Sequence, residues 1–303
     1  MRSRMPVSRT TSVVISGVLV GALALGVVIL SALALERASG TPPTGEAAPP
    51  PSFTFAPRPD TETPAAPTET AAPPEAPAPV AVVPREAERF LAMGSGAWWR
   101  AVAGACGTAD PLVERSTDSG RTWSDVTPRY RDVREVHDLV SFAQTEADLV
   151  GSLGDDCETQ LLRTFTQGRF WEPYEDILAV STYLDATGVV IDGEQVDAPC
   201  AEPRSLRAAG PVTALICDGV AYSDAGNGWV ALEGDGILAL DVWDGAVVGA
   251  TTSADCDGIA VVHLDESAPI GCVPGDPATP TAVALTGSSV GVWNGDTVTA
   301  LRR

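Results

Sequence analysis

The sequence predicts an all-β domain over residues 85–303, about 220 residues, which is enough for one sizeable core. Short runs of β-branched and other apolar residues recur along it, separated by Asp-Gly and Asn-Gly pairs of the kind found in tight hairpin turns. Helical periodicity is weak, and only residues 85–93 could form a helix, of about two turns. The runs most typical of strands are residues 178–184, 188–191, 236–243 and 282–285.

A single membrane-spanning helix is expected before this domain, at residues 13–35, which carry no charge. At about 1.5 Å per residue such a helix crosses the ~30 Å hydrocarbon core. Three arginines lie within residues 1–12, whereas the opposite charges of Glu36 and Arg37, on the other side of the apolar segment, cancel each other. The positive-inside rule therefore predicts a cytoplasmic tail at 1–12 and a domain on the extracellular side of the cell membrane. A cleaved signal peptide is the alternative.

Residues 36–84 are a Pro-, Ala- and Thr-rich linker that holds 14 of the 25 prolines. Such a composition cannot bury enough apolar surface to offset the backbone entropy of folding. We expect a disordered, semi-extended stalk that displays the domain away from the membrane.

The net charge of −21 limits the possible partners. Nucleic acid and anionic lipid headgroups require a basic surface, so neither is expected as a ligand of the domain. All 19 basic residues are arginine, and without lysine a phosphate-binding loop of the Gly-Lys-Ser/Thr type is impossible. Arginine in place of every lysine, together with the linker composition, is typical of an envelope protein from a high-GC, Gram-positive bacterium.

One eight-residue segment follows the pattern Ser-x-Asp-x-Gly-x-Thr-Trp. Its Ser and Asp side chains can accept hydrogen bonds from turn amides, its glycine can take a positive φ, and its tryptophan can cover the hairpin. Two weaker copies keep the glycine and the tryptophan, and the three glycines are 48 and 58 residues apart, near the length of one four-stranded propeller blade. The copies comprise Ser116, Asp118, Gly120, Thr122 and Trp123; Gly168 and Trp171; and Asp224, Gly226 and Trp229.

The segment 116–123 resembles the Asp box of the bacterial neuraminidase repeat family. These β-propellers include sialidases, sortilin-type receptors and photosystem II assembly factors. The resemblance implies a propeller over about residues 90–303, with the boxes on the blade rim and ligands bound near the axis. At ~40–45 residues per blade we expect about five short four-stranded blades. A two-sheet β-sandwich is the alternative fold.

Six cysteines in an exported domain predict three disulfides, with fifteen connectivities open. In two of the pairs the cysteines are 17 and 16 residues apart, which suggests the same short disulfide within each of two blades. The remaining pair would join neighbouring blades. No metal site or cofactor is expected, because the sequence has no Cys-x-x-Cys pair and its acidic turns do not reach the EF-hand pattern. The favoured pairs are Cys200–Cys217, Cys256–Cys272 and Cys106–Cys157.

Two groups of side chains are candidates for ligand contact. Trp98 and Trp99 are adjacent, and adjacent strand residues point to opposite faces, so one of them is expected to face solvent. The other group could clamp an anion or, as the alternative, form a solvated connection between blades. It comprises Arg129, Tyr130, Arg131 and Arg134.

The sequence therefore predicts a membrane-anchored, extracytoplasmic binding or scaffolding module, without catalytic residues, for an envelope protein or a glycan. The competing prediction is a glycoside hydrolase of the sialidase superfamily. Such an enzyme would gather an arginine triad, a tyrosine nucleophile and carboxylates at one mouth of the propeller axis. The family's Arg-Ile-Pro motif occurs nowhere in the sequence.

Overall fold

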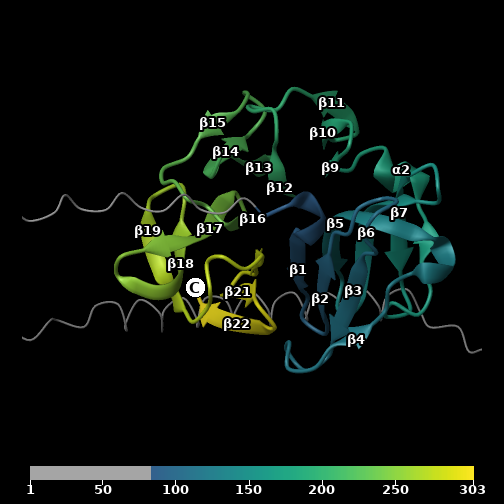
Figure 1. Ribbon diagram of the computed structural model, residues 1–303, viewed down its shortest axis with the longest axis horizontal. Coiled ribbons are helices and arrows are strands. Elements are labelled where there is room, and N and C mark those ends of the chain that lie inside the picture. Colours follow the sequence, from purple (N-terminus) through teal and green to yellow (C-terminus); the bar gives the residue numbers. More distant parts are fainter. Residues whose placement is uncertain (1–82) are drawn as a thin grey trace, which may run out of the picture. The chain divides into compact units, whose positions relative to one another are not determined.

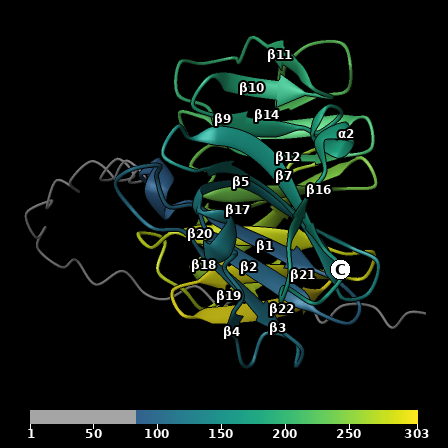
Figure 2. The same cartoon turned by 90° about the vertical axis from the view of Figure 1, so that its right-hand side faces the viewer.

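The computed structural model describes residues 83–303, and six small antiparallel sheets account for most of their regular structure. Within each sheet the strands follow in sequence order from the innermost to the outermost. The innermost strands of the six sheets contact one another in a closed ring, which Figure 1 shows with the blades arranged around it and Figure 2 shows from the side. The domain is therefore a six-bladed β-propeller, and the β-sandwich alternative is wrong.

Four blades have four strands and two have three. The first blade contains β1 (Arg89–Met93), β2 (Trp98–Val102), β3 (Leu112–Ser116) and β4 (Ser124–Asp125). The second contains β5 (Val133–Phe142), β6 (Glu146–Leu153), β7 (Glu158–Thr164) and β8 (Glu172–Pro173). The third contains β9 (Tyr183–Asp185), β10 (Gly188–Ile191) and β11 (Glu194–Val196). The fourth contains β12 (Arg204–Ala209), β13 (Val212–Cys217), β14 (Val220–Asp224) and β15 (Val230–Ala231). The fifth contains β16 (Ala239–Trp243), β17 (Ala246–Ser253), β18 (Cys256–His263) and β19 (Ala268–Val273), and the sixth contains β20 (Thr281–Leu285), β21 (Ser289–Asn294) and β22 (Thr297–Arg302). Short helices η1 (Arg85–Ala87), η2 (Arg129–Arg131) and α2 (Glu175–Leu178) lie in the connections.

The predicted count of five blades is wrong because the third blade is unusually short. It spans only Tyr183 to Val196, far fewer residues than the ~40–45 assumed for a blade. Gly168 lies between β7 and β8 of the second blade and Gly226 between β14 and β15 of the fourth, so the interval of 58 residues contains a whole blade that has no copy of the motif. Part of the predicted strand at 178–184 is the end of α2, which begins with two acidic residues that suit a helix N-terminus.

Residues 83–303 contain no helix with the length and hydrophobicity needed to cross a membrane. The predicted spanning segment at 13–35, the tail at 1–12 and the linker at 36–84, apart from its last two residues, lie outside the described residues. These three assignments therefore stay predictions.

The ring closes through side chains between the first and sixth blades, because each described blade is built from consecutive strands. Arg89, the first residue of β1, donates a hydrogen bond to the carbonyl of Gly295 at 2.8 Å. Its guanidinium lies 4.2 Å from the ring centroid of Trp293 on β21. Arg100 stacks on the same ring at 4.7 Å. Two arginines and one buried tryptophan thus hold the terminal blade against the first.

Replacing Arg89 with methionine is expected to lower the free energy of unfolding by about 1–3 kcal/mol, because it removes a charged hydrogen bond and a cation–π contact. Chemical denaturation measures the loss, and amide hydrogen exchange should accelerate in β20–β22 more than in the second blade. Arg302→Met, at an exposed position of β22, is the control. Uniform acceleration over all blades would contradict this account of ring closure.

All three predicted disulfides are present, so the pairing favoured by the spacing is confirmed. Cys106–Cys157 joins the β2–β3 connection to the β6–β7 turn and so links the first and second blades. Cys200–Cys217 ties the segment before β12 to the end of β13. Cys256–Cys272 joins β18 to β19 within the fifth blade.

Candidate functional site

The turn between β3 and β4 contains the full copy of the repeated motif. The hydroxyl of Ser116 accepts a hydrogen bond from the Gly120 amide at 2.9 Å, and Gly120 has a φ of 81°. The Asp118 carboxylate accepts from the amide of Thr122 at 2.9 Å and from its hydroxyl at 2.7 Å. The indole of Trp123 donates to the Gly120 carbonyl at 3.0 Å. All five residues of the motif thus form hydrogen bonds within the turn itself.

Related turns occur at the same place in the second and fourth blades, between the third and fourth strands. In the second blade the Thr164 hydroxyl accepts from the Gly168 amide at 2.9 Å, and the Trp171 indole donates to the Gly168 carbonyl at 3.1 Å. In the fourth blade the Asp224 carboxylate accepts from two glycine amides, but the Trp229 indole donates to the Asp197 carbonyl instead, at 2.9 Å. The hydrogen bonds give these turns a structural role on the outer side of the blades.

Hydrogen bonds from Thr122, its backbone amide first, lower the pKa of Asp118 to about 2. The carboxylate is therefore charged at neutral pH, and its contribution to stability is lost only as the pH falls through the ordinary range for aspartate towards 2. The Asp118 carboxylate accepts hydrogen bonds from its own turn, so it is not available as a proton donor or acceptor in catalysis.

Trp98 and Trp99 do point to opposite faces of β2, but neither is an open binding platform. Trp99 is 0% exposed and packs edge-on against Trp171, with 5.8 Å between the ring centroids. Trp98 is partly buried and lies against Gly120, where an added Cβ would come within 3.0 Å of its ring. Trp99 is therefore a core residue, and Trp98 packs over the motif turn.

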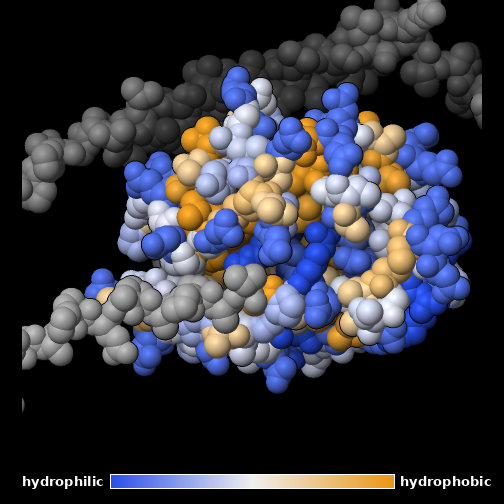
Figure 3. Space-filling view, turned by 45° about the horizontal axis from the view of Figure 1, so that its top comes forward, coloured by the Kyte–Doolittle hydropathy of each residue, from blue (hydrophilic) through white to orange (hydrophobic). Residues whose placement is uncertain are grey.

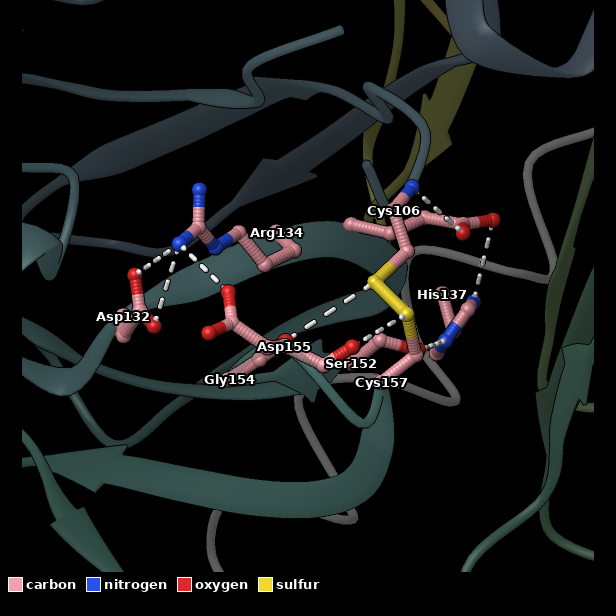
Figure 4. The surroundings of a disulfide bond; sticks show 9 residues. Cys106, Asp132, Arg134, His137, Ser152, Gly154, Asp155 and Cys157 are labelled. Atoms are coloured by element: carbon pink, nitrogen blue, oxygen red, sulfur yellow. Dashed lines mark hydrogen bonds and ion pairs between the residues drawn. A yellow bond between two sulfur atoms is a disulfide. The ribbon is translucent and has the colours of Figure 1, made fainter. Parts of the chain in front are cut away.

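The four residues predicted as an anion clamp, Arg129, Tyr130, Arg131 and Arg134, lie in and next to the connection between the first and second blades. Arg129 pairs with Asp125 at 2.8 Å, and Arg131 pairs with Glu172 at 2.5 Å. The Tyr130 hydroxyl accepts from the Trp171 amide and donates to its carbonyl at 3.1 Å. Arg134 pairs with Asp132 at 3.0 Å and with Asp155 at 3.3 Å, as Figure 4 shows. Every guanidinium of this cluster therefore already faces a carboxylate.

Two cavities lie at opposite ends of the innermost strands. The N-end cavity, of about 500 Å³, is bounded by the residues at which β1, β12 and β20 begin and by the β9–β10 turn. Figure 3 shows this face obliquely, with strongly hydrophilic residues gathered in a hollow near its centre. Its charged lining residues are Arg85, Glu88, Arg89, Asp185, Glu202 and Arg204.

Two of the arginines of the N-end cavity are already engaged. Arg85 pairs with Glu135 at 3.3 Å and donates to the carbonyl of Leu184, while Arg89 is used in ring closure. Arg204 forms no ion pair within residues 83–303, and burial lowers its pKa from the ordinary arginine value. Prolines and aliphatic side chains complete the walls, so the cavity offers one arginine without an ion pair, beside the carboxylates of Glu88, Asp185 and Glu202.

The C-end cavity, of about 380 Å³, is lined where β1, β5, β12, β16 and β20 end. Asp138 on β5 and Asp241 on β16 both project into it, from the second and fifth blades. The Asp241 carboxylate accepts a hydrogen bond from the Leu285 amide at 2.6 Å. Val140 and Trp243, which are 46% and 43% exposed, lie two residues further along the same strands. The cavity therefore has acidic groups inside and apolar groups at its mouth.

An ion pair lies where the two cavities approach each other. Arg207 lines the C-end cavity and Glu88 the N-end cavity, and their side chains are 3.7 Å apart. Arg207 also donates to the carbonyls of Leu206 at 2.7 Å and Arg89 at 3.0 Å, and lies 4.6 Å from the centroid of the Phe90 ring. These contacts fix its guanidinium beside the innermost strands and separate the two cavities.

The environment of the C-end cavity favours the protonated form of both aspartates. Burial raises the pKa of Asp138 to about 6 and that of Asp241 to about 7. Arg207 acts in the opposite direction on both, and the Leu285 amide does so on Asp241. The charge of Asp138 further raises the pKa of Asp241, and the charges of Asp148 and Glu88 further raise that of Asp138, because like charges share a small volume.

Asp241→Asn is expected to stabilise the folded protein at pH 8 and to have little effect at pH 4. A raised pKa means that the folded state binds more protons than the unfolded state between pH 3.8 and about 7, so the wild type loses stability as the pH rises through this window. Asparagine removes that loss and can still accept from the Leu285 amide. Urea denaturation from pH 4 to pH 8 should show the difference growing to about 1 kcal/mol or more. A pH-independent difference would contradict the pKa assignment.

His137 and Ser152 form a buried pair next to the disulfide that joins the first two blades, as Figure 4 shows. The His137 Nε2 atom is 2.8 Å from the Ser152 hydroxyl, and its Nδ1 atom is 3.7 Å from the Glu135 carboxylate. The order resembles a serine–histidine–acid arrangement, but His137 and Ser152 are only 3% and 5% exposed. Burial lowers the pKa of His137 to about 4, so the imidazole is neutral in the core. No substrate can reach this serine, and the pair is structural.

The residues that line the two cavities were not predicted from the sequence. Charged residues on innermost strands could have indicated them. Four such residues are Arg89, Arg204, Asp138 and Asp241. Recognising their convergence required the correct blade count, since residues at equivalent positions of different blades meet only at the axis.

No protein-family model matches this chain, and no curated protein matches it. Among solved structures, the Hadza microbial sialidase Hz136 is similar at 12% identity and a TM-score of 0.34, over 71% of this chain and 52% of that one. YCF48 bound to a D1 peptide is similar at 17% identity and a TM-score of 0.26, over 72% and 68%. The β-propeller domain of the Trilobed protease from Pyrococcus furiosus is similar at 7% identity and a TM-score of 0.37, over 71% and 95%. The chain spans about half the length of the sialidase, and its assignment as a propeller rests on its own six sheets.

Proposed function

We propose that this chain is a membrane-anchored, extracytoplasmic binding or scaffolding module of the Asp-box propeller type, which binds an envelope protein or a glycan without catalysis. One helix at 13–35 anchors it, the linker at 36–84 holds the propeller away from the membrane, and the N-terminus is cytoplasmic. The apolar run and the arginines before it support this arrangement. The net charge of −21 supports a partner other than nucleic acid.

The observation that carries the non-catalytic role is the lack of a tyrosine in the lining of either cavity within the described residues. The N-end cavity has three arginines together with the carboxylates of Glu88, Asp185 and Glu202, and the C-end cavity has the two aspartates with raised pKa values. None of the four tyrosines of the described propeller lines either cavity. Hydrolysis of the sialidase kind requires an arginine triad, a tyrosine and carboxylates at one mouth. Without the tyrosine, both cavities are better suited to holding a ligand than to this hydrolysis.

Site-directed photo-cross-linking in the native membrane tests this proposal. The full-length tagged chain would carry benzoylphenylalanine at position 186 beside the N-end cavity, at position 140 beside the C-end cavity, or at position 170, which is 62% exposed and lies near the outer side of the second blade. We expect one dominant adduct from a cavity position and none from position 170. Equal labelling at all three positions, or none at either cavity, would refute a dedicated binding role. Extraction with alkaline carbonate tests the anchor, since a cleaved domain would be released.

A glycoside hydrolase is the second candidate, and the two aspartates of the C-end cavity favour it. Carboxyl groups with pKa values of about 6 and 7 in one cavity are the kind of pair from which a general acid is drawn. A panel of aryl glycosides incubated with the full-length protein decides the matter. Turnover that disappears in Asp138→Asn and Asp241→Asn would establish the enzyme, and an inactive protein across the panel would remove this candidate.

A further inference from the structure

The acidic residues on the innermost strands and on the strands next to them differ in whether an arginine neutralises their charge. Asp148 on β6 receives two hydrogen bonds from Arg163, both of 2.6 Å. Glu114 and Glu135 also face arginines, at 2.7 and 3.3 Å. Asp138 and Asp241 form no ion pair within residues 83–303. Asp148 also lines the C-end cavity and is paired there, whereas Asp138 and Asp241 face the same cavity without a counterion.

The guanidinium of Arg207 does not supply that counterion. It is held by the carbonyls of Leu206 and Arg89 and faces Glu88 on the other side of the axis. Its attraction lowers the pKa of both aspartates only in part, since burial keeps them at about 6 and 7. The charged groups around the cavity are Glu88 before β1, Asp138 on β5, Asp148 on β6 with Arg163 on β7, Asp192 after β10, Arg207 on β12 and Asp241 on β16.

The shape of the cavity suits a long side chain with a charged end. Its walls include Leu91, Met93 and Leu285, which can contact an alkyl stem, as well as the two carboxylates. Trp243 and Val140 are large apolar residues exposed at the mouth, where they would otherwise contact water. An aromatic face beside a carboxylate is favourable for guanidinium and ammonium groups. The net charge of −21 would draw a basic partner towards this surface.

We propose that the C-end cavity is a docking site for a basic side chain of a partner protein, with an arginine or lysine inserted so that its charged group meets Asp138 and Asp241 and its stem passes Trp243. This inference rests on the proposed binding function and names the chemistry of its ligand. Insertion of a cation returns both carboxylates to their charged form, so protons compete with the ligand. Binding therefore strengthens as the pH rises from 5 to 8.

Calorimetric titration of the full-length chain in detergent micelles tests the site, with the probe acetyl-Gly-Gly-Arg-Gly-Gly-amide. The same peptide with citrulline in place of arginine has nearly the same shape and no charge. We expect the arginine peptide to bind about tenfold or more tightly than the citrulline peptide at pH 8, and the preference to shrink at pH 5. Equal binding of the two peptides would overturn the proposal whatever the variants show.

The double variant Asp138→Asn/Asp241→Asn is expected to lose the preference, whereas Asp244→Asn keeps it, because Asp244 is exposed next to Trp243 but does not line the cavity. Retention of the preference by the double variant would also overturn the site. Tighter binding of n-butylguanidinium than of the peptide would overturn the assignment to a protein partner. If cross-linking finds a partner that the double variant still captures, the cation site fails while the binding function stands. If the peptide preference is present but no partner is captured, the binding function fails while the cation site stands.

Discussion

Replacement of Trp171 by alanine is expected to lower the free energy of unfolding by about 4 kcal/mol, the largest effect of any single substitution considered. Trp171 is 0% exposed and packs against Trp99 in a core shared by the first two blades. Its indole donates to the carbonyls of Gly168 at 3.1 Å and Val126 at 3.2 Å, so it closes its own turn and also joins that turn to the preceding blade. The truncation leaves a cavity and two unpaired carbonyls.

Equilibrium denaturation in urea measures the loss, and two further variants isolate its cause. Trp171→Phe fills most of the cavity but removes the donor, and about 1–2 kcal/mol is expected to be lost. Phe170→Ala, at the preceding position, removes a ring that is 62% exposed and should change stability by less than about 0.5 kcal/mol. A loss in Trp171→Ala no larger than that in Phe170→Ala would show that the shared core is not what holds the two blades together.

Removal of the Cys106–Cys157 disulfide by a double serine substitution is expected to cost about 4 kcal/mol. The bridge closes a loop of 51 residues between the first and second blades, and the entropy that it removes from the unfolded chain grows with loop length. The Cys106 amide also donates to Glu135 at 3.3 Å, so the bridge lies beside the ion pair of Glu135 with Arg85 at the N-end cavity.

The Cys256–Cys272 bridge provides the comparison, because it closes only 16 residues within one blade. Its removal should cost about 3 kcal/mol, less than removal of the inter-blade bridge. Thermal unfolding of the two double-serine variants under identical conditions measures the order. The reverse order would mean that native contacts, and not restriction of the unfolded chain, dominate the contribution of these disulfides.

Local features of this protein could be predicted from the sequence because they depend on neighbouring residues. The hydrogen bonds of the turn at Ser116 to Trp123 all lie within a span of eight residues, and the spacing of four cysteines indicated two short bridges. The all-β class followed from short apolar runs with Asp-Gly and Asn-Gly turns. Residues 188–191, predicted as a strand, are β10.

Other features depended on how the blades close into a ring. The three-stranded blade at Tyr183–Val196 is too short to show a repeat, so the count of blades came only from the sheets. Arg129 to Arg134 form a cluster along the chain, yet Arg131 pairs with Glu172 of β8 and Arg134 with Asp155 of the β6–β7 turn, which only the fold brings next to them.

The sequence by itself determined the β class, the motif turn and the chemistry available to the chain. The tertiary structure alone decided which charges are paired and which are left facing a cavity. Asp138 and Asp241 lie on β5 and β16, in blades far apart in the sequence, and only ring closure brings both carboxylates to one end of the axis. Their raised pKa values have the same origin, because burial and the absence of a counterion are properties of the assembled ring and not of either strand.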